Sequence, residues 1–146
     1  MAKQRGRRGD YRAFVPMTTR WADNDAYGHI NNVAYYSFVD TAVNQLLIER
    51  GLLDVEQSQA IGVVAESGCR YHASATYPDV IHAGVRVGRL GTSSVRYEVG
   101  LFRNDEDEAV AEAFFVHVFV TRDTRRPTPI AQALRDYLAV LVVEGI

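Results

Sequence analysis

The sequence predicts an α+β domain in which one antiparallel sheet curves around a single long helix. Three observations support this: an apolar stretch with helical spacing near the N-terminus, four later stretches of alternating apolar and polar residues, and a length of 146 residues. Hydrophobic residues make up 47% of the chain, which is enough for one core. We therefore expect residues 13–146 to form a single domain.

The first predicted element is a strand over residues 14–21. Pro16 indicates an edge position or a bulge, because proline cannot donate to a strand ladder. A helix follows over residues 32–50, where either Asn31 or Asn32 is a suitable N-cap. This helix is apolar around most of its circumference, which is typical of a helix enclosed by other structure.

The rest of the chain changes to a two-residue rhythm, which predicts strands. These strands cover residues 61–74, 80–90, 93–103 and 109–122. An acidic turn at 104–108 closes a hairpin between the last two, and a terminal helix is expected from about 129 to 143. Such a sheet leaves an edge and part of the helix open, so we expect a second copy to cover them in a dimer or a dimer of dimers.

Charge is unevenly distributed along the chain. Residues 1–12 carry a net charge of +4 although the whole chain carries −2. A basic segment without apolar periodicity is typical of a solvated arm, so we expect residues 1–12 to be flexible. Contact with nucleic acid through this arm is a weaker alternative, and we expect neither a nucleic-acid nor a membrane partner.

Composition also bears on the cellular compartment. No apolar stretch is long enough to cross a bilayer, and the N-terminus lacks the hydrophobic centre of a secretory signal. Cys69 is the single cysteine, which excludes an intramolecular disulfide and a cysteine-rich metal site. We therefore expect a cytoplasmic protein without a bound metal.

The most informative stretch is "TRWADNDAYGHINNVAYYSFVD", in which polar side chains crowd the start of the predicted helix. Asp25 lies in the loop before the helix, and Gly28 gives that loop freedom to bend around a ligand. The first helical amides, near Asn31 and Asn32, have no intrahelical partner and could stabilise an oxyanion. A carboxylate beside such amides indicates an acyl-transfer site that suits a thioester, although Asp23 and Asp25 could equally be turn and capping residues.

The same stretch resembles the signature of the hotdog-fold acyl-CoA thioesterases of the 4-hydroxybenzoyl-CoA thioesterase type. In that family an arginine-aromatic pair leads to D-x-D-x-x-G-H-[VI]-N-N and then to a helix with a tyrosine. The matching positions here are Arg20, Trp21, Asp23, Asp25, Gly28, His29, Ile30, Asn31, Asn32 and Tyr35. The segment "VGRLGTSSVRYEVGLF" is similar to the junction between the family's third and fourth strands.

The resemblance implies a hotdog fold and hydrolysis of an acyl-CoA to free acid and coenzyme A. Asp25 would be the catalytic carboxylate, as nucleophile or general base, and the Asn32 backbone N–H the oxyanion donor. Gly28 would let the loop close over the thioester. His29 would contact the substrate or hold the loop. Coenzyme A is part of the substrate, so no separate cofactor is expected.

Further residues are candidates for substrate binding. Asn31 belongs to the helix start, Tyr35 could line the acyl pocket, and Glu66 could face that pocket or a partner subunit's site. The coenzyme A phosphates need cations, and guanidinium groups suit them. Several arginines are available, and the leading group lies at the predicted strand junction: Arg89, Gly91, Thr92 and Ser93.

Several alternatives remain open. A hotdog hydratase or dehydratase and a non-catalytic acyl-CoA-binding module are the rival functions. The sequence determines neither the acyl group nor the choice between nucleophilic attack and general-base catalysis.

Overall fold

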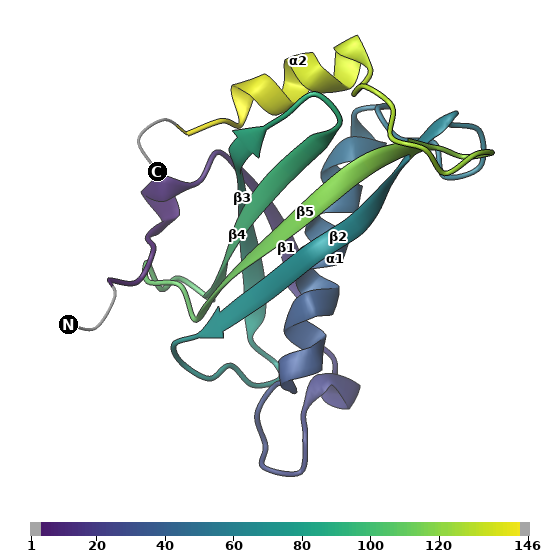
Figure 1. Cartoon of the computed structure of the whole chain (residues 1–146). Coiled ribbons are helices and arrows are strands. Elements are labelled where there is room, and N and C mark those ends of the chain that lie inside the picture. The colour runs from purple at the N-terminus through teal and green to yellow at the C-terminus, as the bar shows by residue number, and fades with distance from the viewer. Residues whose placement is uncertain (1–3, 144–146) are drawn as a thin grey trace.

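The computed structural model of the chain describes residues 4–143, which form one antiparallel sheet and two helices. The strand order is β1-β3-β4-β5-β2, and Figure 1 shows the long helix α1 crossing one face of the sheet while α2 lies at one end. The elements are β1 Ala13–Thr18, α1 Asn32–Glu49, β2 Ala60–Tyr71, β3 Val80–Leu90, β4 Ser94–Arg103, β5 Ala111–Thr121 and α2 Gln132–Val140. The predicted α+β class, a curved five-stranded sheet around a long helix with a C-terminal helix, is confirmed.

Helix α1 forms the centre of the core. Its buried residues are Tyr35, Phe38, Val39, Ala42, Val43, Leu46 and Leu47, and they pack against the inner side chains of the sheet. The helix is not fully enclosed, since Val33 near its start is 69% exposed and Ile48 near its end is 48% exposed. One side of α1 therefore remains open along its length.

The two edges of the sheet differ. Strand β1 has six residues and contains Pro16, which pairs with His82 of β3, so the predicted edge position is confirmed. Strand β2 has twelve residues and pairs only with β5, with a bulge between Val64 and Glu66. The long free edge of the sheet is therefore the one formed by β2.

Several predicted elements are shorter in the structure, and two of them have a clear cause. The first strand ends at Thr18 because residues Trp21–Asp23 form a 3-10 turn. The terminal helix begins only at Gln132, because the segment before it is held by the strands: the Thr128 N–H donates to Phe119 O and the Ile130 N–H to Thr92 O. These bonds keep the backbone extended until the helix starts.

The N-terminal segment departs from a free solvated arm over the part that the structure describes; residues 1–3 lie outside that part. Arg5 and Arg7 form ion pairs with Glu108 and Asp107 in the acidic turn after β4. Tyr11 is only 6% exposed. Opposite charge on the turn, together with a buried aromatic anchor, explains why this basic segment packs against the sheet.

Within residues 4–143, neither helix is both long and apolar enough to cross a membrane.

Candidate active site

The loop between β1 and α1 folds into a narrow hairpin that returns to the helix start. The Asp25 N–H donates to His29 O at 2.8 Å, and the Asn31 N–H donates to Asp23 O at 2.8 Å. These two rungs hold the two aspartates of the motif opposite the residues that lead into α1. The polar crowding in the sequence therefore corresponds to one compact loop.

Gly28 forms the bend of this hairpin. Its φ of +83° lies in the left-handed region that side chains disfavour, and its N–H donates to Asp25 O at 3.1 Å. The segment after β2 supports the bend from behind, since the Thr76 hydroxyl donates to Gly28 O at 2.8 Å. The Asn24 side chain also contacts Thr76 and accepts from the Tyr77 N–H. The glycine is needed for backbone conformation, and the loop is held from two sides.

The two aspartates have different surroundings. Asp23 is 6% exposed, and both of its carboxylate oxygens accept from Arg20, one from the backbone N–H and one from the guanidinium. Asp25 uses Oδ1 to accept from Tyr27 N–H at 2.9 Å and from His29 N–H at 3.4 Å. Among the described residues, Asp25 Oδ2 has no hydrogen-bond partner. Asp23 thus holds the loop, while Asp25 keeps one oxygen available.

The first turn of α1 leaves one amide unpaired. Asn31 caps the helix, because its side-chain oxygen accepts from Val33 N–H at 3.0 Å and its carbonyl from Ala34 N–H at 2.8 Å. The Asn32 N–H has no protein partner in the part of the chain that the structure describes. The amide that the motif assigns to oxyanion binding is therefore the one that capping leaves free.

Asp25 and this amide belong to the same short loop and helix start. Asp25 pairs with His29, and Asn32 is three positions beyond His29, which spans at most about 10 Å of chain. A thioester carbonyl bound in this region would have a carboxylate and an unpaired N–H nearby. This arrangement can stabilise negative charge that develops on the carbonyl oxygen.

His29 and Tyr35 take different positions. His29 is exposed, and its backbone, not its ring, provides the hydrogen bonds that hold the loop. Tyr35 is 3% exposed and packs edge-on against Phe38 and Tyr71, so it lies in the core and not on the loop surface. Burial raises the pKa of the Tyr35 hydroxyl.

The remaining candidates lie away from the loop within one chain. Glu66 pairs with Val116 beyond the bulge, on the face of the sheet that points away from α1. Arg89 lies at the end of β3, whereas the loop follows from β1 at the start of β3, where Thr18 pairs with Val80. The structure therefore does not bring these residues to Asp25 in one chain: Glu66, Arg89, Gly91, Thr92 and Ser93.

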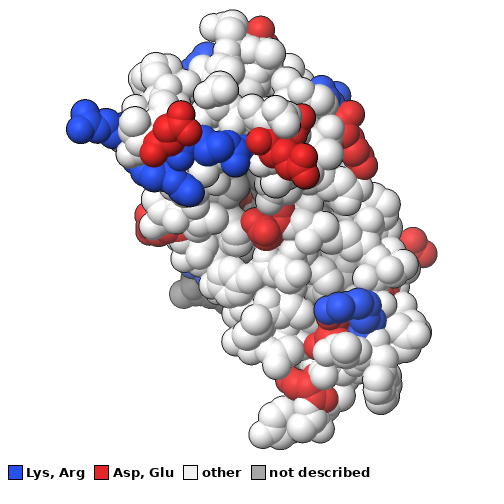
Figure 2. All heavy atoms as spheres, turned by 90° about the vertical axis from the view of Figure 1, so that its right-hand side faces the viewer, with Lys and Arg blue, Asp and Glu red and all other residues white. Residues whose placement is uncertain are grey.

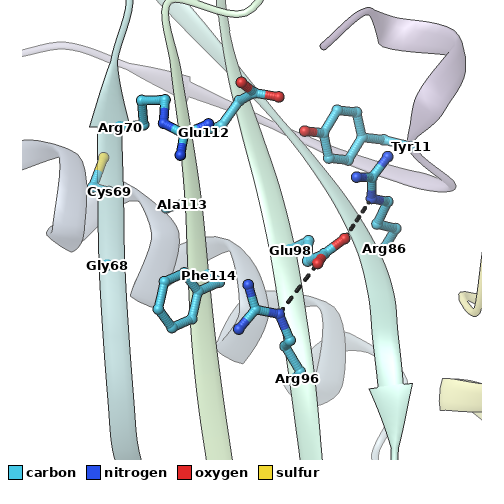
Figure 3. A pocket seen from close by; sticks show the side chains of 10 residues that line it. All are labelled: Tyr11, Gly68, Cys69, Arg70, Arg86, Arg96, Glu98, Glu112, Ala113 and Phe114. Atoms are coloured by element: carbon cyan, nitrogen blue, oxygen red, sulfur yellow. Dashed lines mark hydrogen bonds and ion pairs between the residues drawn. The ribbon is translucent and has the colours of Figure 1, made fainter. Parts of the chain in front are cut away.

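Two of the arginines that could hold coenzyme A phosphates already form ion pairs within the chain. Figure 3 shows Glu98 between Arg86 and Arg96, with N···O distances of 2.9 and 3.2 Å. These residues line a cavity of about 290 Å³ on the face of the sheet opposite α1. Arg96 also stacks on Phe114 at 4.0 Å from the ring centroid. Within residues 4–143 there is no cluster of three side chains suited to a metal ion.

One residue at the site has no counterpart in the sequence-based prediction. The Tyr71 hydroxyl, at the end of β2, donates to Asn32 O at 3.0 Å and so ties the sheet to the first residue of α1. The neighbouring Cys69 is half-buried, and burial raises the pKa of its thiol, which disfavours a nucleophilic role. A tyrosine at a strand end is too common a feature for the sequence alone to indicate this contact.

Comparisons with known proteins agree on the fold and the family. The family model of the thioesterase-like superfamily matches residues 19–138. Among solved structures, the PA5185 protein from Pseudomonas aeruginosa strain PAO1 is 52% identical, with 97% of this chain and 99% of that chain covered and a TM-score of 0.94. A thioesterase superfamily protein from Jannaschia sp. CCS1 is 25% identical over 88% of this chain and 82% of that chain, with a TM-score of 0.80.

More distant structures share the fold. Slr0204, a 1,4-dihydroxy-2-naphthoyl-CoA thioesterase from Synechocystis, is 13% identical, with 86% of this chain and 94% of that chain covered and a TM-score of 0.79. Among curated proteins there is no significant match. The architecture is the hotdog fold that the motif implied.

Proposed function

Since the chain belongs to the thioesterase-like superfamily, which makes it a thioester hydrolase, we propose that it hydrolyses acyl-CoA thioesters at the loop before α1. The observation that supports this most directly is the pair of unengaged groups in that loop. Asp25 keeps one carboxylate oxygen free, and the Asn32 N–H is the amide that the helix cap does not use. A carboxylate and an amide that face one carbonyl supply both the attack and the oxyanion stabilisation.

In this mechanism the substrate carbonyl oxygen accepts from the Asn32 N–H, and the α1 dipole adds partial positive charge there. Asp25 then acts in one of two ways. It attacks the carbonyl carbon to form an anhydride and release the coenzyme A thiolate, after which water cleaves the anhydride. Alternatively it takes a proton from a water molecule, which attacks the carbon and expels the same thiolate.

The acyl-CoA substrate class is supported by the fold and the family. The 1,4-dihydroxy-2-naphthoyl-CoA thioesterase from Synechocystis shares the fold and, by its name, acts on a coenzyme A thioester. The single cysteine suits a reducing compartment, which is consistent with action in the cytoplasm.

We further propose that the working unit is at least a homodimer joined through β2. Strand β2 presents twelve residues along a free edge, which folded proteins normally cover. On the same side, Val64, Tyr71 and Val33 are large apolar residues that are 42 to 69% exposed. Figure 2 shows an area without charged side chains below the centre of the view, with charged groups both above and below it.

A two-fold pairing of β2 with itself must be antiparallel, because both copies use the same surface. It sets the far end of one sheet beside the loop of the other copy. Glu66 and the Arg89–Ser93 junction, which lie away from Asp25 within a chain, would then be supplied from the partner. In this proposal the dimer is the smallest assembly that could combine the loop of one chain with residues of another.

A thiol-release screen tests the proposed activity. Purified protein is incubated with a panel of saturated, unsaturated and aromatic acyl-CoAs, and free coenzyme A is measured with a thiol reagent. We expect release of coenzyme A from at least one member without loss of the enoyl chromophore of crotonyl-CoA. Loss of that chromophore without thiol release would indicate a hydratase, and binding without any thiol release would indicate a non-catalytic acyl-CoA-binding protein.

A single turnover in ¹⁸O-labelled water separates the two roles of Asp25. General-base catalysis places the label in the first acid released. Nucleophilic attack followed by water attack on the Asp25 carbonyl gives an unlabelled first product, because its new oxygen comes from the aspartate.

A further inference from the structure

A second cavity lies on the helix side of the sheet, at the opposite end of α1 from the loop. It has a volume of about 180 Å³ and lies between the C-terminal half of α1, the segment after it and the inner faces of β2 and β5. Most of its wall is apolar, made by Leu47, Leu53, Val55, Ile61 and Phe119. An apolar cavity of about 150 Å³ holds one benzene molecule, so this space matches one aromatic ring or a chain of about six carbons.

Two polar residues, His117 and Asn44, line this cavity. His117 is 5% exposed, and its Nε2 atom is buried without a hydrogen-bond partner among residues 4–143. Burial lowers the pKa of the imidazole, against a smaller opposing effect of Asp40. A buried neutral imidazole without a partner is unusual, because buried polar groups are normally hydrogen-bonded. Nε2 itself is enclosed by protein, so a ligand would meet the other ring nitrogen, Nδ1, which lies next to Gly62.

Gly62 leaves the space over this imidazole open. A Cβ atom at this position would lie 3.2 Å from His117 Nδ1 and 3.5 Å from the Phe119 ring. Glycine weakens the interior of a strand, and it is typical of places where a ligand approaches the backbone closely. A ligand atom that occupied the place of the missing side chain would be within hydrogen-bond reach of Nδ1.

Within one chain this cavity is remote from the reacting groups. Asn44 lines it and is twelve residues beyond Asn32 along α1, which is about 18 Å at the helical rise of 1.5 Å per residue. An acyl group of ring size bound at Asn32 could not reach the cavity of its own chain.

The proposed dimer removes this separation. If the twelve residues of β2 pair antiparallel with their copies over their full length, Ala60 lies opposite Tyr71 and Gly62 opposite Cys69. Tyr71 contacts Asn32 at the start of α1. The opening at Gly62 in one copy is then next to the free Asn32 amide of the other.

We propose that this cavity binds the acyl group of a thioester whose carbonyl is held at the loop of the other copy, and that it selects compact acyl groups of about one ring. The proposal rests on the acyl-CoA hydrolase function and on the β2 dimer argued above. It assigns specificity to Gly62, whose missing side chain keeps the cavity open, and to His117, which can pair with a polar atom of the acyl group.

Equilibrium binding tests the proposal without turnover. Benzoyl-CoA and acetyl-CoA are titrated by calorimetry into the Asp25→Asn dimer, and into the same dimer carrying Gly62→Ala or Gly62→Val. We expect benzoyl-CoA to bind at least tenfold more tightly than acetyl-CoA, and this ratio to fall stepwise toward one as the side chain at position 62 grows. Val63→Ile is the matched control, because it adds a methyl group to the same strand at the neighbouring residue, which points to the other face of the sheet, and should keep the ratio.

The alternative outcomes are distinguishable. An unchanged ratio in Gly62→Val, with sedimentation confirming that the dimer persists, would overturn the assignment of the cavity, as would equal affinity for the two ligands before substitution. A preference for benzoyl-CoA that Gly62→Val removes, in a protein whose unsubstituted form releases no thiol from any acyl-CoA, would reject hydrolysis and keep the cavity as an acyl-binding site.

Discussion

At the scale of single residues, the two aspartates of the motif differ in how many of their carboxylate oxygens accept hydrogen bonds. Asp23 gives both oxygens to Arg20 in a nearly buried contact, whereas Asp25 gives one oxygen to the loop and keeps the other free. The sequence predicted a role for Asp25 through its resemblance to a family. The hydrogen bonds supply a physical reason for choosing the second aspartate over the first.

Asp25→Asn should abolish most thiol release while leaving the fold intact. The amide oxygen can still accept from the Tyr27 N–H, so the loop keeps its shape, but the side chain can neither attack a carbonyl nor take a proton. We expect a fall in kcat of about 10² to 10⁴-fold, the usual contribution of a general base. Thiol-release kinetics measure it, and a kcat within threefold of the original would contradict the proposed role.

Asp23→Asn should act chiefly on stability. The new amide NH₂ would face an N–H donor of Arg20, so one hydrogen bond of the buried side chain would be lost. The charge-assisted bond to the Arg20 guanidinium would be lost or weakened as well. We expect a loss of about 2 kcal/mol in the free energy of unfolding. Urea denaturation measures it beside Asp25→Asn, whose midpoint should stay close to that of the original protein. Equal loss in both variants would show that the two carboxylates are not distinct.

At the scale of elements, the end of β2 fixes the start of α1. The Tyr71 hydroxyl donates to the carbonyl of Asn32, the residue whose N–H is proposed to bind the oxyanion. The two groups belong to one residue, so a tie to the carbonyl restricts the direction of the amide. If the Asn32 N–H binds the oxyanion as proposed, Tyr71 acts as a positioning residue through this bond.

Tyr71→Phe should lower kcat more than it changes KM. Loss of one hydrogen bond that contributes about 1 kcal/mol to orientation corresponds to roughly a fivefold fall in rate. Tyr137→Phe in α2 is a matched control that removes a hydroxyl without a partner among the described residues. If Tyr71→Phe changed only the unfolding midpoint, its role would be structural.

The periodicity of the sequence predicted each strand and α1 to within a few residues, since alternation and helical spacing are local properties. It did not predict how the N-terminal segment packs. Tyr11 lies over Gly84 and Gly100, which pair with each other across β3 and β4 and whose added Cβ atoms would lie 2.9 and 2.6 Å from its side chain. Two strand glycines in register form this groove, and strand register is not a local property of the sequence.

Tyr11→Ala should therefore destabilise the domain although it lies in a segment predicted to be a free arm. The ring is nearly fully buried and packs edge-on against Phe102, so truncation should cost about 3 kcal/mol. Tyr11→Phe keeps the ring in the groove and should lose much less. Unfolding curves of the two variants test this prediction. Similar midpoints for Tyr11→Ala and the original protein would mean that the N-terminal segment does not stay packed on the sheet.

At the scale of the whole molecule, the candidate residues lie apart within one chain. The sequence offered Asp25, Glu66 and the Arg89–Ser93 junction as candidates for one site, but the fold sets these at different places on the sheet. A motif identifies residues that act together without stating which chain supplies each. The free β2 edge and the cavity at His117 support the proposal that two copies contribute to each site.

A composite site can be tested by mixing two damaged copies. Asp25→Asn removes the reacting group, and Gly62→Trp fills the acyl cavity; each homodimer should hydrolyse a ring-sized acyl-CoA poorly. In a heterodimer one site would receive both defects and the other neither, so random pairing at equal amounts should restore about a quarter of the original activity, since half of the dimers are mixed. Two affinity tags allow the heterodimer to be isolated and its thiol release measured. If Asp25 and the cavity of the same chain formed the site, each chain would still carry one defect, and mixing would restore no activity.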